Sequence, residues 1–240
     1  MAEPEFLQAT RAFYDDVAAS YATRFGRELA ARPVDRALLA GFAELVRAAS
    51  PAPIADIGCG PGSVTAHLNN MGSTAFGIDL SPHMVAQARQ AYPDLRFEVG
   101  SMLALDLPDC RLGGIVAWYS IIHIPDEQLP QAFGEFFRVL APGGYLMLAF
   151  QTGTGVFDRV KMAGHAVSVD FRRRQPEQVA EVLRRAGLDV RARVVREPDD
   201  DGEFPEQEPQ SFLLARKPSA PAQSSEAPPT ARVATPSARR

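Results

Sequence analysis

A glycine-rich turn directly after a short apolar strand constrains the fold of this chain more than any other feature. Residues 54–63 read IADIGCGPGS, and a helical pattern containing Val64 and Leu68 follows. Glycines let the backbone turn tightly and let a ligand approach the main chain closely. Open α/β sheets bind ligands at the carboxyl ends of their strands, which is where this turn lies. The segment therefore predicts a ligand-binding strand–turn–helix unit.

Apolar runs separated by helical or loop patterns predict the strands of one sheet. Five of them span residues 53–57, 74–78, 95–99, 115–119 and 144–150. Strands that alternate with helices form right-handed βαβ units, so an α/β fold with a mainly parallel sheet is expected. Two later strand-like segments, at residues 189–195 and 211–215, flank an acidic loop at 197–209.

The predicted helices carry end signals. Ser81 before Pro82 predicts an N-cap, and Gly187 predicts the C-terminal cap of a helix that Pro176 opens. Asp126 is expected to cap a helix that reaches Leu140.

The chain divides into three parts. Residues 1–50 contain two predicted helices, at about 6–29 and after Pro33, and residues 51–217 contain the predicted core. Residues 218–240 are rich in Pro, Ser and Ala and lack apolar periodicity. Such a tail buries too little surface to offset its ordering entropy, so it is predicted to be disordered.

Composition narrows the classes of partner. The 240 residues are 46% hydrophobic with a net charge of −4, which is typical of one sizeable α/β domain and disfavours nucleic acid. The two cysteines form neither a disulfide framework nor a metal spacing, so we expect no metal and a cytoplasmic setting. The most apolar run, residues 115–124, is shorter than the ~20 residues of a membrane helix. The oligomeric state stays open.

Two aspartates indicate what the turn binds. Asp79 ends the second predicted strand, where a carboxylate can accept the hydroxyls of a ribose. Asp56 lies on the first predicted strand, at a position where nicotinamide dehydrogenases usually have an apolar residue. Its charge suits a cofactor that carries an ammonium and a sulfonium more than a pyrophosphate. An NAD-dependent oxidoreductase stays an alternative, because residues 58–63 resemble the glycine fingerprint of that class. A purely structural turn beside an incidental aspartate is the other alternative.

Three segments together carry a family resemblance: DIGCGPG at 56–62, GIDLSP at 77–82 and LAPGG at 140–144. They resemble the class I S-adenosylmethionine-dependent methyltransferases, in particular the small-molecule methyltransferase-domain group, over residues 14–217. The resemblance implies a Rossmann-like, doubly wound, seven-stranded sheet whose last strand is antiparallel and lies beside the fifth. It also implies S-adenosylmethionine as cofactor and an N-terminal helical lid, residues 1–50.

The resemblance also implies the cofactor-binding residues. Gly58 and Gly60 would lie against the methionine part, Asp79 would hold the ribose, and Leu80 and Met84 would lie near the adenine. Ser101 stands where the family often has an aspartate. The full expected set is Tyr14, Tyr21, Asp56, Gly58, Cys59, Gly60, Asp79, Leu80, Met84, Ser101, Met102 and Trp118.

Methyl transfer is an in-line displacement, so proximity is the main requirement and a base is needed only if the acceptor is protonated. His123, just past the fourth strand, is a candidate base because an ordinary histidine pKa suits that role, and Tyr119 is the second catalytic candidate. The other interpretation is that His123 packs on or caps the next helix. The predicted function is methyl transfer to O, N or C of a small-molecule acceptor, with a non-catalytic binding module as the alternative.

Residues 151–174 are expected to line the acceptor pocket. They include His165, Asp170 and the arginine run 172–174, which either binds an anionic acceptor or forms a solvated basic patch. No Asn-Pro-Pro-Tyr signature follows the fourth strand, which disfavours a nucleobase or an amide as acceptor.

Overall fold

The computed structural model describes residues 3–158, 169–201 and 203–219. The predictions for His165 and for residues 220–240 of the expected tail lie outside these ranges. Within them, no helix is both long enough and apolar enough to cross a membrane.

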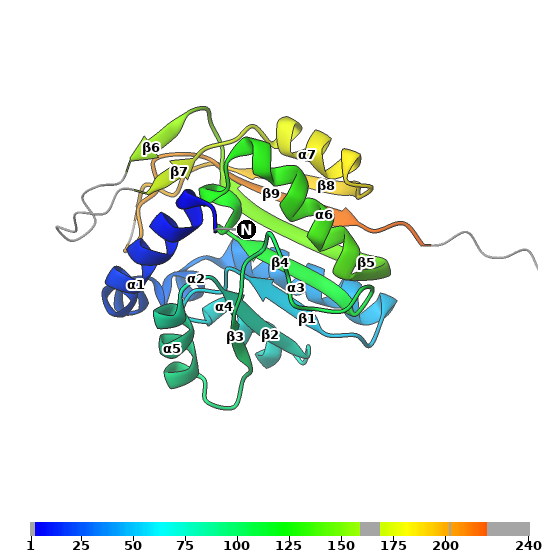
Figure 1. The fold of residues 1–240 in the computed structure, drawn as a ribbon, viewed down its shortest axis with the longest axis horizontal. Coiled ribbons are helices and arrows are strands. Elements are labelled where there is room, and N and C mark those ends of the chain that lie inside the picture. Colours follow the sequence, from blue (N-terminus) through cyan, green and yellow to red (C-terminus); the bar gives the residue numbers. More distant parts are fainter. Residues whose placement is uncertain (1–2, 159–168, 202, 220–240) are drawn as a thin grey trace, which may run out of the picture.

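A seven-stranded sheet forms the centre of the molecule, in the order β3-β2-β1-β4-β5-β9-β8 (Figure 1). Its strands are β1 (Ile54–Ile57), β2 (Ala75–Asp79), β3 (Phe97–Val99), β4 (Leu112–Trp118), β5 (Leu140–Gln151), β8 (Asp189–Arg196) and β9 (Gln210–Arg216). The first five strands pair in parallel, and β9 runs antiparallel between β5 and β8. The expected Rossmann-like sheet with its antiparallel last strand is confirmed.

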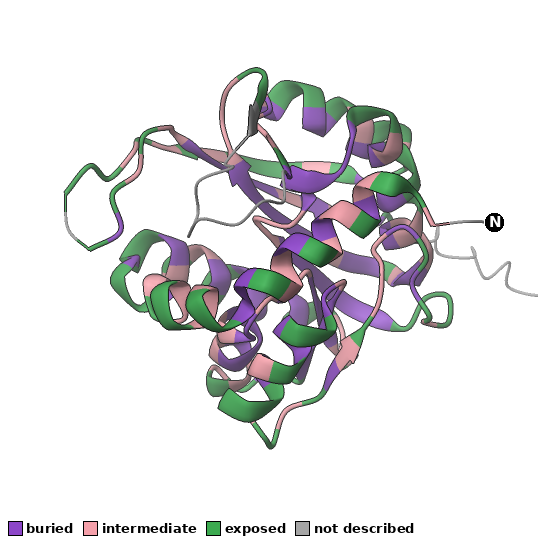
Figure 2. Ribbon diagram, turned by 60° about the vertical axis from the view of Figure 1, so that its left-hand side comes forward, coloured by how far each residue is buried: buried purple, intermediate pink, exposed green. Residues whose placement is uncertain are grey.

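Helices cover both faces of the sheet. The helices are α1 (Glu5–Phe25), α2 (Glu28–Ala31), α3 (Pro33–Ala49), α4 (Ser63–Asn70), α5 (Pro82–Ala91), α6 (Leu129–Val139) and α7 (Pro176–Arg185). Apolar side chains of α3 and α4 pack on one face, and those of α6 and α7 pack on the other. Figure 2 shows the resulting pattern, in which buried strands lie inside helices whose outer sides are exposed.

Alternation along β1 decides where its one charged side chain lies. Ile54 packs with the α3–α4 cluster, whereas Ala55 and Ile57 pack with the α6–α7 cluster. Successive side chains of a strand point to opposite faces, so Asp56 shares the face of Ile54. Its carboxylate consequently meets α4, where Thr65 lies.

The helix ends agree with the sequence at two places. The Ser81 hydroxyl accepts a hydrogen bond from the Met84 N–H, which satisfies one orphan donor at the start of α5. Gly187 follows α7 in a left-handed conformation with φ +89°, as a C-terminal glycine does.

Other predicted boundaries were wrong. The helix expected over residues 6–29 ends at Phe25, and α2 begins only at Glu28 after a turn at Gly26. Asp126 is no helix cap: it begins a 3₁₀ turn, α6 starts at Leu129, and the Asp126 carboxylate instead binds an arginine. The fourth and fifth strands begin earlier than expected, at residues 112 and 140.

A two-stranded hairpin, β6 (Val156–Asp158) with β7 (Asp170–Arg172), was not predicted. It lies beside α1 (Figure 1), where the rings of Phe13 and Phe171 meet edge to face at 6.1 Å. The hairpin and α1 thus stand together over the carboxyl ends of the central strands.

Candidate functional site

The glycine turn after β1 lies close to β2 and to the residues that follow β4. Gly58 and Cys59 both donate their N–H groups to the Ile78 carbonyl, at 2.7 and 3.1 Å. A Cβ on Gly58 would lie 2.2 Å from Cβ of Ser120, and the φ angle of +76° already disfavours any side chain. Gly58 is therefore required by close packing.

Gly60 differs from Gly58 in what surrounds it. A Cβ there would meet no atom within 4 Å, although the φ angle is +52°. The Gly60 N–H donates to Oδ2 of Asp79 at 2.8 Å, which joins the turn to the end of β2. The turn thus leaves an open space at Gly60, directly beside a carboxylate.

Asp79 is buried and held by backbone donors. Its second oxygen accepts the Ser81 N–H at 2.8 Å. Burial raises the pKa of this carboxyl to about 6, and the bonds from Ser81 and Gly60 oppose that rise. Because each oxygen can accept more than one hydrogen bond, the carboxylate keeps capacity for a ligand's hydroxyl groups.

Asp56 is fully buried, and only one of its two carboxylate oxygens has a hydrogen-bond partner among the described residues. Its Oδ2 accepts the Thr65 hydroxyl at 2.7 Å, while Oδ1 has no hydrogen-bond partner among the described residues. Burial, together with the charge of Asp79, raises the pKa of Asp56 to about 7. A cationic group placed at Oδ1 would satisfy this oxygen and favour the ionised carboxylate.

Three adjoining hollows open at this edge of the sheet. The central hollow contains about 720 Å³ of space free of protein atoms, part of it open to solvent. Its lining residues come from α1 and α5, from the ends of β1, β2 and β4 and from the turns after the first four strands: Leu7, Thr10, Tyr14, Tyr21, Ile57, Gly58, Gly60, Asp79, Leu80, Met84, Gly100, Ser101, Met102, Trp118, Tyr119, Ser120, His123 and Ile124.

The central hollow brings together ten of the twelve residues predicted to bind the cofactor, and both catalytic candidates. The other two, Asp56 and Cys59, line a side hollow that continues past Gly60 towards Arg32. Burial raises the pKa of the Cys59 thiol, as expected for a small buried residue that is no nucleophile.

A third hollow lies between α1, the hairpin and the loop before β9. We call it the acidic hollow after the glutamates in its lining, Glu28, Glu203, Glu206 and Glu208. It shares Tyr14, Tyr21 and Tyr119 with the central hollow and contains about 1500 Å³ of free space, part of it open to solvent. The central hollow and the acidic hollow therefore adjoin at these three tyrosines.

Tyr119 stands at the junction in a strained backbone conformation. Its φ angle of +52° is unusual for a residue with a side chain, and such strain concentrates at functional sites. Burial raises the pKa of its phenol well above the ordinary value, so this hydroxyl stays protonated. Its ring meets Trp118 edge to face.

Among the described residues, the hydrogen bonds of His123 go to α1 and to β7, and the N-cap of α6 is Gln128. Nε2 of His123 lies 2.7 Å from the Tyr14 hydroxyl and Nδ1 lies 2.9 Å from the backbone oxygen of Asp170. Burial lowers the pKa of His123 to about 4, and the nearby Arg174 acts in the same direction. The ordinary histidine pKa assumed from the sequence therefore does not hold.

The arginine run is not a solvated patch. Arg174 is buried and binds the backbone oxygens of Ile121 and Ile124, and Arg172 pairs with Asp170 at 2.7 Å. The Arg174 guanidinium ties the segment after β7 to the turn after β4, whereas the Arg172 pair stays within β7.

Sequence reasoning missed several lining residues. Leu7 and Thr10 precede Tyr14 by seven and four residues, so helical periodicity from Tyr14 could have found them. Arg32 gave no such signal. It is buried, lines the side hollow and has an Nε without a hydrogen-bond partner within the part of the chain described.

Comparisons with known proteins agree with this geometry. A family model described as "Methyltransferase domain" matches residues 54–144. Trans-aconitate 2-methyltransferase of Escherichia coli is 40% identical over 95 residues, which cover 39% of this chain and 36% of that protein. Malonyl-[acyl-carrier protein] O-methyltransferase of Pseudescherichia vulneris is 32% identical over 118 residues, covering 49% and 45%. The chain thus spans less than half the length of these curated relatives.

A solved structure shares the fold over nearly the whole chain. It is the 1,6-didemethyltoxoflavin-N1-methyltransferase of Burkholderia thailandensis, bound to 1,6-didemethyltoxoflavin and S-adenosylhomocysteine. Its TM-score is 0.66 at 17% identity, with 91% of this chain and 92% of that one covered.

The hollows fit the cofactor of such enzymes. S-adenosylmethionine combines a ribose, a sulfonium and an amino acid. The open space at Gly60 would be filled by a Cβ, Asp79 adjoins it, and the unpaired Asp56 oxygen provides a buried anionic acceptor. The glycine turn, the two carboxylates and the sheet agree with these matches: residues 54–144 match the methyltransferase-domain model, and the fold is similar to that of a methyltransferase bound to S-adenosylhomocysteine.

Proposed function

We propose that this chain transfers a methyl group from S-adenosylmethionine to a small-molecule acceptor. The observation that carries the proposal is that two hollows adjoin. The central hollow, with Gly60 and Asp79, shares Tyr14, Tyr21 and Tyr119 with the acidic hollow. A donor in the first and an acceptor in the second would meet at these three tyrosines.

The cofactor would be held along the central hollow. Asp79 would accept the ribose hydroxyls, the backbone at Gly58 and Gly60 would face the methionine part, and Leu80 and Met84 would contact the adenine. The remaining contacts would come from Tyr14, Tyr21, Ser101, Met102 and Trp118. When bound, S-adenosylmethionine supplies the methyl group on a sulfonium, which makes that carbon electrophilic.

Opposite charges in the side hollow would hold the amino-acid part. The unpaired oxygen of Asp56 suits an ammonium, and the unpaired Nε–H of Arg32 suits a carboxylate. Cys59 lines the same hollow as a small apolar residue.

The protein's own contribution is orientation and the exclusion of water. Displacement at an activated carbon gains most from holding the two reactants in line, and aromatic walls achieve this without reacting. Tyr119 stays protonated, so its hydroxyl would donate a hydrogen bond at the junction.

Binding of S-adenosylhomocysteine, measured by calorimetry, and transfer of an isotopic methyl label to a metabolite extract test the proposal. We expect Asp79→Ala to weaken S-adenosylhomocysteine binding by about 1–3 kcal/mol, because the ribose hydroxyls and the Gly60 N–H lose their acceptor. Unchanged affinity would remove Asp79 from the site, and no binding at millimolar ligand would reject the proposal.

Cofactor binding is expected to strengthen with pH. In the free protein the pKa of Asp56 is about 7, so its carboxyl is mostly protonated at pH 6. A bound ammonium favours the ionised form, so binding releases a proton and affinity rises as pH increases. Between pH 6 and pH 7.5 the gain should be roughly tenfold.

Asp56→Asn is the matched control for this pH dependence, because the amide keeps an acceptor for the Thr65 hydroxyl but cannot ionise. Calorimetry in buffers of different ionisation enthalpy should show proton release for the unmodified chain and less for the variant. Equal pH dependence in both proteins would exclude Asp56 as the titrating group.

A further inference from the structure

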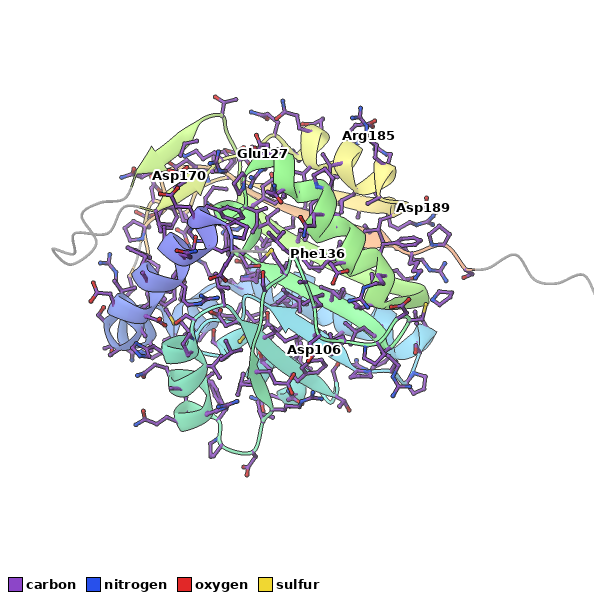
Figure 3. All side chains as sticks on the ribbon, in the orientation of Figure 1. Asp106, Glu127, Phe136, Asp170, Arg185 and Asp189 are labelled. Atoms are coloured by element: carbon purple, nitrogen blue, oxygen red, sulfur yellow. The ribbon has the colours of Figure 1, made fainter. Side chains whose placement is uncertain are left out.

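Tyr14 and His123 form a hydrogen-bonded pair whose direction is fixed. Nδ1 of His123 lies 2.9 Å from the Asp170 carbonyl oxygen, which can only accept, so Nδ1 carries the hydrogen. Nε2 is then the basic nitrogen, and the Tyr14 hydroxyl donates to it at 2.7 Å. Asp170, labelled in Figure 3, lies on β7 of the hairpin, close to α1.

Only one member of the pair reaches both spaces. Tyr14 lines the central and the acidic hollow, whereas His123 lines the central hollow alone among the hollows described. Within this pair, Tyr14 is therefore the residue at the boundary of the two hollows, and His123 accepts the hydrogen bond of its hydroxyl.

The surroundings keep His123 neutral. Its ring is enclosed by edge contacts from Tyr14 and Phe171. The charged group acting on it is Arg174, and the Asp170 carboxylate is paired with Arg172 instead. With a pKa of about 4, the imidazole is available as a proton acceptor throughout the neutral range.

The described lining of the acidic hollow offers little positive charge to an anionic acceptor. Four carboxylates and a single guanidinium, that of Arg24, belong to its described lining; the four are Glu28, Glu203, Glu206 and Glu208. The arginines that pair with these carboxylates lie outside the described lining: Arg27, Arg32, Arg173 and Arg196. Aromatic rings such as Phe25 and Phe204 complete the wall, which suits a flat, uncharged ligand.

We propose that Tyr14 and His123 form a proton relay, and that the acceptor is therefore protic, an aromatic hydroxyl or ring N–H and not a carboxylate. The inference rests on the proposed methyl transfer. A carboxylate has no proton to lose at neutral pH, so the relay would have no role in forming a methyl ester.

The step balances without any further reactant. The acceptor's O–H or N–H bond breaks as that atom bonds to the methyl carbon, and the electron pair of the broken carbon–sulfur bond stays on sulfur. The released proton moves to the Tyr14 oxygen while the Tyr14 proton moves to Nε2 of His123. The imidazolium keeps its bond to the Asp170 carbonyl and returns the proton to solvent after the product leaves.

The class of product tests the inference directly. The chain is incubated with S-adenosylmethionine carrying a tritiated methyl group and a metabolite extract, and the products are treated with mild alkali. Methyl ethers and N-methyl groups keep the label, which is the expected result. Methyl esters release it as volatile methanol, which would overturn the inference but not the proposed function. No labelled product at all would overturn both.

Two variants distinguish a proton relay from a latch, by which we mean a Tyr14–His123 hydrogen bond that only holds α1 in place. Tyr14→Phe removes the hydroxyl and keeps the ring, and His123→Gln keeps an amide acceptor for Tyr14 that cannot take up a proton. With the labelled acceptor and saturating cofactor, both should lower kcat by about 10²- to 10⁴-fold while S-adenosylhomocysteine affinity changes less than about twofold. Tyr145→Phe, on β5 away from the hollows, is the control for losing a phenol and should change neither.

A latch predicts a different pattern, because His123→Gln would then retain nearly full activity. The pH profile gives a second readout. For the unmodified chain, kcat should fall less than about twofold from pH 8 to 5.5, whereas a base with an ordinary histidine pKa would lose about tenfold. Full activity of His123→Gln, or the tenfold loss, would overturn the relay.

Discussion

Gly58→Ala is expected to lower the free energy of unfolding by about 2–5 kcal/mol. The left-handed backbone at φ +76° costs a residue with a side chain about 1–2 kcal/mol. The new Cβ would stand 2.2 Å from Cβ of Ser120, which adds about 1–3 kcal/mol of overpacking. Ser120 cannot move freely, because its hydroxyl donates to the Ile57 carbonyl at 2.6 Å.

Gly60→Ala should separate folding from binding. Its Cβ has no atom within 4 Å, so only the backbone strain of about 1–2 kcal/mol applies to stability. The methyl group would project into the hollow, however. The affinity for S-adenosylhomocysteine should therefore fall by more than about tenfold, because the cofactor can approach the protein backbone closely only at a glycine.

Gly72→Ala is the matched control. This glycine also has a positive φ, +81°, and open space around its Cβ position, but it follows α4 and lines none of the three hollows. Denaturant unfolding and calorimetry of the three variants provide the measurements. If Gly60→Ala and Gly72→Ala bound S-adenosylhomocysteine equally well, Gly60 would not adjoin the cofactor.

The parts of the site that could be predicted are those encoded locally. The turn at 58–62 and the acid at Asp79 are read from adjacent residues, because a strand end, a left-handed backbone and a helix start impose their own residue types. The Ser81 cap was predicted for the same reason. Where a parallel strand ends, the residue after it reaches the ligand edge, so Tyr119 and His123 were expected there.

The parts that could not be predicted depend on long-range contacts. The Tyr14–His123 bond joins residues 109 positions apart. The β6–β7 hairpin has strands of three residues each, and Phe171 on β7 packs against Phe13 of α1, a residue far away in the sequence. Arg174 appeared solvated in the sequence because arginine usually is, and only the fold supplies the carbonyl groups that bury it.

Arg174 is the residue whose removal should cost the hairpin region most. Its guanidinium donates to the Ile121 and Ile124 carbonyl oxygens and, at 2.9 Å, to Asp126, while its side chain is only 4% exposed. Those carbonyls belong to the turn that carries His123. Arg174→Met would leave both without a donor, at about 1–3 kcal/mol each, so a loss of about 2–5 kcal/mol in the free energy of unfolding is expected.

The ion pair itself should contribute little to that loss. The Asp126 side chain is 75% exposed, and exposed pairs stabilise by at most about 1 kcal/mol. Asp126→Ala should therefore change the urea midpoint only slightly, whereas Arg174→Met should shift it strongly at a constant denaturant slope. Arg174→Lys should fall between the two, because an ammonium cannot span the two carbonyls and the carboxylate in one plane. Equal losses for Asp126→Ala and Arg174→Met would assign the stabilisation to charge pairing. The stability of the turn that orients His123 would then depend on salt concentration, because salt screening weakens exposed ion pairs and leaves buried carbonyl contacts almost unchanged.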